Sequence, residues 1–172
     1  MHVTIRDKNM NADNNFIEDE DDHETLIRWV VFHLGNEAYC VEVEQVAEIL
    51  RINTILPVPG SPDYVLGITN IRGNIVSVID GRKRLNLQAT DYTDRSRMIV
   101  IESENDVVAV VVDDVVDIVD IPESSVNSNP KVKSREDSRY VTGVITDDDN
   151  LIIALSAEKF VTENTFDMAA GF

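Results

Sequence analysis

The sequence contains one cysteine, few aromatic residues (6%) and no apolar run long enough to cross a membrane. A single cysteine, Cys40, cannot form an internal disulfide and excludes a metal site built on several cysteines. A membrane-spanning helix needs about 20 consecutive apolar residues, and the N-terminus lacks the apolar core of a secretion signal. We therefore expect a cytoplasmic protein in which Cys40 is a small buried side chain on a strand.

Basic residues are also scarce. The chain has 15 Lys and Arg against 32 Asp and Glu, which gives a net charge of −17, and no Lys or Arg lies between Met98 and Pro130. Nucleic acids and anionic membranes are bound through Lys and Arg that displace counterions. The composition therefore predicts no nucleic acid and no direct membrane binding, and by elimination it favours protein partners. The acidity also favours solubility.

Val and Ile are abundant among the 43% of residues that are apolar, which favours strands. Pairs of apolar, β-branched runs are separated by short polar turns, a pattern that predicts β-hairpins. The predicted hairpins are 27–34 with 38–43, 64–69 with 75–79, 97–102 with 107–112, and 140–146 with 151–155. About ten short strands in all predict a barrel or a sandwich.

Helices are expected to be short. Val43, Val46, Ala47 and Leu50 recur at helical spacing and predict about two helical turns. Residues 81–87 form a helical turn or connector, and Ser156 begins a helix over 157–162 as its N-cap. The polar residues 1–25 predict a disordered acidic tail, residues 26–163 a single domain, residues 123–138 a long loop within it, and residues 164–172 a frayed end.

No catalytic or metal-binding pattern is found. Asp147 to Asn150 suggests a calcium loop, but Leu151 and Ile152 occupy positions that need a ligand and a glycine. Asp113, Asp114, Asp117 and Asp120 are read as a solvated acidic strand edge, and His33 has no expected nucleophile beside it. We predict a protein that is not an enzyme and needs no cofactor. A small β-barrel enzyme or ligand carrier stays as an alternative, which a deep polar cavity near His33 would support.

The stretch from Gly67 to Asp80, together with motifs upstream of it, matches the pattern of a known family. The motifs, in order, are Leu34-Gly-Asn-Glu-Ala-Tyr39, Val46-Ala-Glu-Ile-Leu50, Pro57-Val-Pro-Gly-Ser-Pro62, Gly67-Ile-Thr-Asn-Ile-Arg-Gly73 and Val78-Ile-Asp80. In order and spacing they resemble the CheW family of chemotaxis coupling proteins over about residues 28–162. Ile71, Ser77 and Gly81 depart from the residues that are usual in the family.

This resemblance implies a mainly β fold of two SH3-like, five-stranded β-barrels packed together, with short helices. It implies a non-catalytic adaptor that couples methyl-accepting chemotaxis receptors to the histidine kinase CheA in signalling arrays. The partners would be the cytoplasmic receptor tip and the kinase's regulatory domain, with no small-molecule ligand. A CheW-like scaffold of a non-flagellar chemosensory or localisation pathway is the alternative.

Arg72 is a cation at the bend of a predicted hairpin. One interpretation is structural, a bidentate bond to a carboxylate such as Glu48. The other is an anchor at an interface, where arginine is enriched, and the resemblance supports a place near the receptor-binding surface. Val46, Glu48 and Ile49 have the same two interpretations, helix core and cap or receptor groove. The candidate partner-binding residues are Val46, Glu48, Ile49, Gly67, Asn70, Arg72 and Gly73.

Overall fold

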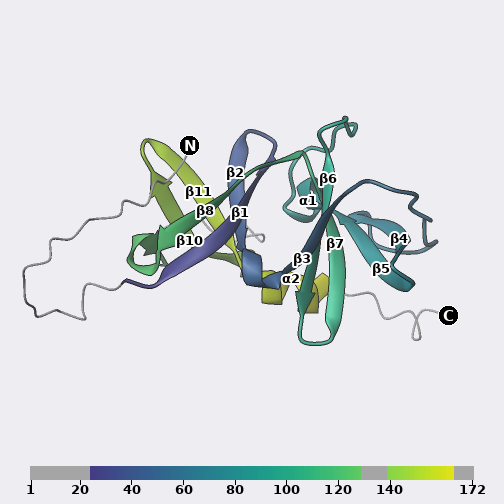
Figure 1. Cartoon of the computed structure of the whole chain (residues 1–172). Coiled ribbons are helices and arrows are strands. Elements are labelled where there is room, and N and C mark those ends of the chain that lie inside the picture. The colour runs from purple at the N-terminus through teal and green to yellow at the C-terminus, as the bar shows by residue number, and fades with distance from the viewer. Residues whose placement is uncertain (1–23, 129–138, 165–172) are drawn as a thin grey trace, which may run out of the picture.

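The computed structural model describes residues 24–128 and 139–164. They form two β-sheets in two lobes that lie side by side (Figure 1). The first lobe contains the sheet β8-β1-β2-β11-β10-β9, and the second lobe contains the sheet β3-β6-β7-β5-β4. The expected mainly β fold with two packed lobes is confirmed. The first sheet has six strands because the two-residue β9 also pairs with β10.

The strands of the first lobe are β1 (Leu26–Leu34), β2 (Glu37–Glu42), β8 (Asp114–Pro122), β9 (Val126–Asn127), β10 (Val141–Asp147) and β11 (Asn150–Leu155). Those of the second are β3 (Val46–Arg51), β4 (Val65–Ile71), β5 (Asn74–Asp80), β6 (Arg97–Ser103) and β7 (Asp106–Val112). The helices are η2 (Val43–Gln45), α1 (Gly81–Arg84), η3 (Glu123–Ser125) and α2 (Ala157–Asn164). All four predicted hairpins are present as antiparallel pairs.

The predicted helix over residues 43–50 is wrong. Only one 3₁₀ turn, η2, forms there, and the chain then continues as β3, paired with β6. A register irregularity between Val46 and Glu48 places Val46 and Ile49 on the same side, where both pack on the same core cluster. A bulge of this kind interrupts the two-residue alternation of a strand. The bulge therefore gives the apolar residues of this strand a spacing close to that of a helix.

The described residues contain three apolar cores, one within each lobe and one between the lobes. One fills the first lobe around Trp29 and Cys40, and a second fills the other lobe around Met98 and Ala109. The third lies between the lobes and takes Val30 and its alternate neighbours on β1, residues from β6 and β7, and Phe160 of α2. Strands such as β1 and β7 are buried on both faces, which explains their continuous apolar runs.

Two polar clusters tie the lobes where the chain crosses between them. Asp113 separates β7 from β8 and accepts hydrogen bonds from Arg82 Nε at 2.8 Å and from the backbone N–H of Gly35 at 2.9 Å. On α1, the Arg84 guanidinium lies 4.3 Å from the ring centre of Tyr64 and 5.0 Å from that of Tyr140. Since Arg82, Arg84 and Tyr64 belong to the second lobe and Gly35 and Tyr140 to the first, these contacts fix the relative position of the lobes.

The β4–β5 and β10–β11 hairpins are built alike. Each begins with the pattern Tyr-Val-x-Gly, at residues 64–67 and 140–143, and each ladder has a register irregularity before its glycine. In each, the tyrosine carbonyl accepts a hydrogen bond at 2.8 Å from the backbone N–H of the residue that precedes the following helix, Asp80 before α1 and Ser156 before α2. The two lobes are therefore structurally equivalent along this part of the chain.

The predicted cap of α2 is confirmed, because Ser156 Oγ accepts a hydrogen bond from the Lys159 backbone N–H at 3.1 Å. Asn164, expected to begin a frayed end, is the last residue of α2 and is 5% exposed. Residues 1–23, 129–138 and 165–172 lie outside the described residues, so the limits of the tail and domain stay predictions. Within the described part of the chain, no helix is long and apolar enough to span a membrane.

Candidate functional site

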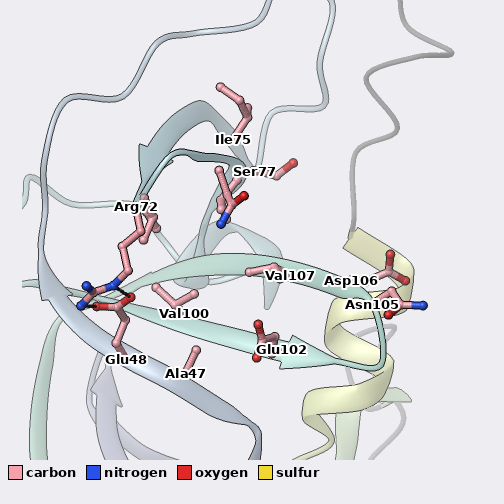
Figure 2. A pocket seen from close by; sticks show the side chains of 13 residues that line it. Ala47, Glu48, Arg72, Ile75, Ser77, Val100, Glu102, Asn105, Asp106 and Val107 are labelled. Carbon is pink, nitrogen blue, oxygen red and sulfur yellow. Dashed lines mark hydrogen bonds and ion pairs between the residues drawn. The ribbon is translucent and has the colours of Figure 1, made fainter.

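The predicted site residues lie at one end of the second lobe and on its inner face. Val46, Glu48 and Ile49 are on β3, and the others are on β4 or in the turn between β4 and β5. The strands β3 and β4 are at opposite ends of the sheet order. The structure nevertheless brings Glu48 and Arg72 together, because the sheet curls (Figure 2).

The turn that carries Arg72 has two residues in the left-handed region, with φ of 53° at Arg72 and 87° at Gly73. Positive φ at both central positions defines a type I′ hairpin turn, which matches the twist of the flanking strands. Asn70 Oδ1 accepts a hydrogen bond from the Gly73 backbone N–H at 2.9 Å and so supports the turn. Glycine adopts this conformation freely, whereas arginine does so at a cost of roughly 1–2 kcal/mol.

Arg72 and Glu48 form the predicted bidentate pair. The distances are 2.9 Å from Nε to Oε2 and 2.9 Å from Nη2 to Oε1. The hydrogen bonds from Arg72 lower the pKa of the Glu48 carboxyl from its ordinary value, and Glu48 raises the pKa of the Arg72 guanidinium in return. The Arg72 side chain is 76% exposed and that of Glu48 20%. The pair thus ties the hairpin tip to β3 and leaves the cation accessible from solvent.

The backbone geometry explains why position 67 is a glycine. A Cβ at this position would lie 2.1 Å from the carbonyl oxygen of Leu56, and its φ is 146°. Leu56 and Ile68 form an isolated bridge with N–O distances of 2.8 and 2.9 Å, and Thr69 Oγ1 donates to the Thr54 carbonyl at 2.7 Å. The segment after β3 therefore runs against β4, and only glycine permits this approach.

A groove of about 430 Å³ opens beside the Arg72–Glu48 pair, and it is called the second-lobe groove below (Figure 2). Its apolar lining is Ala47, Ile71, Ile75, Val76, Val100 and Val107, and its charged lining is Glu48, Arg72, Glu102 and Asp106. The side chain of Ile75 is 56% exposed. Such a mixed, accessible surface is suited to binding a protein.

The groove brings together some of the candidate partner-binding residues but not others, and their role in binding stays a prediction. Of the seven candidates, Glu48 and Arg72 line the groove, whereas Val46 and Ile49 pack against the core between the lobes. Ile75, Glu102 and Asp106 were missed. Ile75 follows directly on the motif and could have been included, but Glu102 and Asp106 reach the groove only through the pairing of β6 with β3.

The family comparison decides the identity of the fold. The family model described as the CheW-like domain matches residues 28–164. The chain belongs to the CheW-like domain family. Chemotaxis protein CheW of Rhizobium meliloti is 30% identical over 130 residues, which cover 76% of this chain and 84% of that protein. Probable chemotaxis protein CheW of Rhizobium etli is 29% identical over 140 residues, 81% of this chain and 90% of that protein.

A solved structure agrees with this assignment. The scaffolding protein TtCheW from Thermoanaerobacter tengcongensis matches with a TM-score of 0.72 and 31% sequence identity. The match covers 76% of this chain and 89% of that chain. The CheW-like fold is therefore supported by both sequence and structure.

The candidate reactive groups of this CheW-like domain, Cys40 and His33, lie on β2 and β1 of the first lobe. Cys40 is fully buried, and burial raises the pKa of its thiol. His33 Nδ1 lies 2.9 Å from Asp114 Oδ1, so this nitrogen is paired with a carboxylate. The hollow beside His33 is lined mainly by apolar residues. Among residues 24–128 and 139–164, no group of three or more ligands could hold a metal ion.

Proposed function

We propose that this CheW-like protein is a non-catalytic adaptor that couples methyl-accepting chemotaxis receptors to a CheA-type histidine kinase. The observation that carries the proposal is the second-lobe groove, whose hairpin wall is held in place by the bidentate Arg72–Glu48 pair. Membership in the CheW-like domain family supports the pathway. The protein contributes binding free energy and geometry, and the proposed place of action is the membrane-associated receptor array.

The proposed receptor surface includes Glu48, Asn70, Arg72 and Gly73 at the end of the second lobe. Arg72 presents hydrogen-bond donors to solvent although its charge is balanced by Glu48. Exposed Ile75 adds apolar area to the same surface. Val46 and Ile49 support this surface indirectly, because they hold β3 against the core. Gly67 allows the chain after β3 to close the lobe.

The proposed kinase contact is made by the end of the first lobe with the regulatory domain of the kinase. No single contact has to be tight. A micromolar dissociation constant corresponds to about −8 kcal/mol, and several such contacts reinforce one another in an array through effective concentration. An adaptor of this kind needs two accessible surfaces and a rigid connection between them, which the shared central core provides.

The test is a calorimetric titration of the full chain against two partners from the same genome, the kinase regulatory domain and a soluble receptor-tip fragment. We expect dissociation constants in the micromolar range or tighter for both. Arg72→Glu should weaken receptor-tip binding about tenfold or more, as expected for a central interface arginine. Absence of binding to either partner by the wild-type chain would contradict the proposal.

A charge swap separates the two roles of Arg72. The double variant Glu48→Arg with Arg72→Glu restores an ion pair in the same place. If the swap recovers both stability and receptor binding, the pair acts only by shaping the groove. If it recovers stability alone, Arg72 itself contacts the receptor.

A further inference from the structure

The end of the first lobe carries a counterpart of the second-lobe groove. It is a hollow of about 660 Å³, called the first-lobe hollow below, whose lining includes Val116, Asp149, Asn150 and Leu151 as well as His33 and Glu37. Leu151 and Val116 are 63% and 43% exposed. Strand pairing shows which positions of the two lobes correspond, and it relates Glu48 and Arg72 to Asp117 and Asp148, the sequence neighbours of the lining residues Val116 and Asp149.

The outer strand of each lobe sets the first correspondence. In the second lobe Val46 pairs with Ile101 and Glu48 with Val100, with a register irregularity between them. In the first lobe Val115 pairs with Phe32 and Asp117 with Val31, again with an irregularity between the two pairs. Because the β6–β7 and β1–β2 hairpins correspond, Asp117 occupies the position of Glu48.

The hairpin turn sets the second correspondence. The β4–β5 ladder closes with Ile71 opposite Asn74, and the β10–β11 ladder closes with Asp147 opposite Asn150. Arg72 and Asp148 are the first residues of the two turns, and their φ values are 53° and 58°. Asp148 therefore occupies the position of Arg72.

This equivalence exposes a difference in charge. In the second lobe the acidic position is paired with an arginine from the same chain. In the first lobe both positions are aspartates, Asp149 follows them, and none of the three has an ion-pair partner within the described residues. One carboxylate oxygen of the neighbouring Asp147 is buried without a hydrogen-bond partner.

We propose that Asp117 and Asp148, beside the first-lobe hollow and at the positions equivalent to Glu48 and Arg72, bind an arginine or lysine side chain of the kinase regulatory domain. This rests on the proposed function and deepens it by naming the chemistry of the kinase contact. A guanidinium or ammonium group would supply the charge that the aspartates lack. Leu151 and Val116 would contact apolar atoms beside it.

Two other occupants are disfavoured, one by charge and one by the lack of converging ligands in the described residues. A second copy of the chain brings its own net charge of −17, which opposes self-association through an acidic surface. A bound metal ion needs several converging ligands, and no such group is found in the described residues. A basic protein segment agrees with both the charge and the apolar rim.

The test uses Asp148→Arg in the full chain. Arginine already adopts this backbone conformation at the equivalent Arg72, so the variant should fold and form an internal pair with Asp117. We expect unchanged or higher thermal stability and at least about tenfold weaker binding to the kinase regulatory domain. Asp91→Arg, at an exposed residue outside both sites, makes the same charge change and should bind as the wild type.

A second variant guards against misfolding of the first. Asp148→Asn with Asp149→Asn keeps side-chain size, and it should weaken binding about fivefold to tenfold and reduce the salt dependence of the affinity.

If the wild type binds the kinase domain and both variants bind it equally well, the inference is wrong and the proposed function stands. If the wild type does not bind, the proposed function fails first. Loss of self-association in sedimentation, with kinase binding unchanged, would identify a second copy as the occupant.

Discussion

Apart from β9, the two lobes share the same strand order and pairing, but they differ in the charged residues at their outer ends. The second lobe closes its end with a bidentate ion pair from its own chain, Arg72 to Glu48. The first lobe has Asp148 and Asp117 at the equivalent positions. Under the proposed function, this difference in a few rim charges would let one fold serve two kinds of contact. Three sets of variants test this contrast, beginning with the one expected to have the largest effect.

The largest difference between the lobes is expected when the equivalent glycines, Gly67 and Gly143, are replaced by alanine and the loss of stability is compared. In Gly67→Ala the new Cβ would overlap the Leu56 carbonyl, 2.1 Å away, at a φ of 146°. In Gly143→Ala the nearest atoms are a Val126 methyl at 2.8 Å and the Asn127 carbonyl at 2.9 Å. We expect Gly67→Ala to lower the free energy of unfolding by roughly 3 kcal/mol or more, and Gly143→Ala by about 1–2 kcal/mol. Urea unfolding measures both, and equal losses would contradict the difference in closure.

The ion pair should make the second lobe sensitive to acid. The pKa of Glu48 in the folded chain lies below its ordinary value of 4.5 because of the hydrogen bonds from Arg72. Stabilisation by a carboxylate with a lowered folded-state pKa is complete above the unfolded value and is lost as the pH falls through the folded value. Arg72→Gln should therefore be less stable than the wild type at pH 7, by less than Gly67→Ala, and the difference should vanish well below pH 4.5.

The first lobe provides the control for this titration. Asp148→Asn removes the charge at the equivalent position, keeps the side-chain size and tolerates the positive φ. It should not lower the stability at pH 7, because no ion pair to this aspartate exists within the described residues. A loss as large as that of Arg72→Gln, with the same dependence on pH in denaturant titrations, would remove the contrast between the lobes.

The smallest effect on stability is expected from the exposed apolar residues at the two ends. Ile75→Ser and Leu151→Ser remove side chains that are 56% and 63% exposed. Each should change the free energy of unfolding by no more than about 0.5 kcal/mol. The two variants should differ in binding: Ile75→Ser should bind the receptor-tip fragment more weakly, and Leu151→Ser should bind the kinase regulatory domain more weakly. If calorimetry shows both variants weakening the same partner, the lobes do not divide the partners in this way.

The sequence predicted what depends on local patterns. Alternating apolar runs around short turns located the four hairpins. An arginine at a glycine-bearing bend, with Glu48 as the suggested carboxylate, predicted the observed pair. Ser156 was identified as a cap from residue type and position alone. In each case the deciding contacts are made by neighbours in sequence or by a distinctive charge.

The rest depends on long-range pairing. The bulge in β3 gave its apolar residues a helical spacing, and only the ladder with β6 shows that Val46 and Ile49 belong to a strand. The wall of the groove formed by Glu102 and Asp106 comes from a hairpin about 30 residues beyond Arg72 in sequence. The correspondence between residues 64–67 and 140–143 is too sparse in sequence to be noticed without the matching ladders.

The core between the lobes has a consequence for how such a chain can change over generations. Val30, Phe160 and their neighbours are contributed by both lobes and by α2, so a substitution there affects both lobes at once. The rims at the far ends share no such constraint, because residues such as Leu151 and Ile75 are exposed. Mutations can therefore accumulate at either rim independently, while the interior keeps the spacing between the two rims, and so between the two proposed contacts, unchanged.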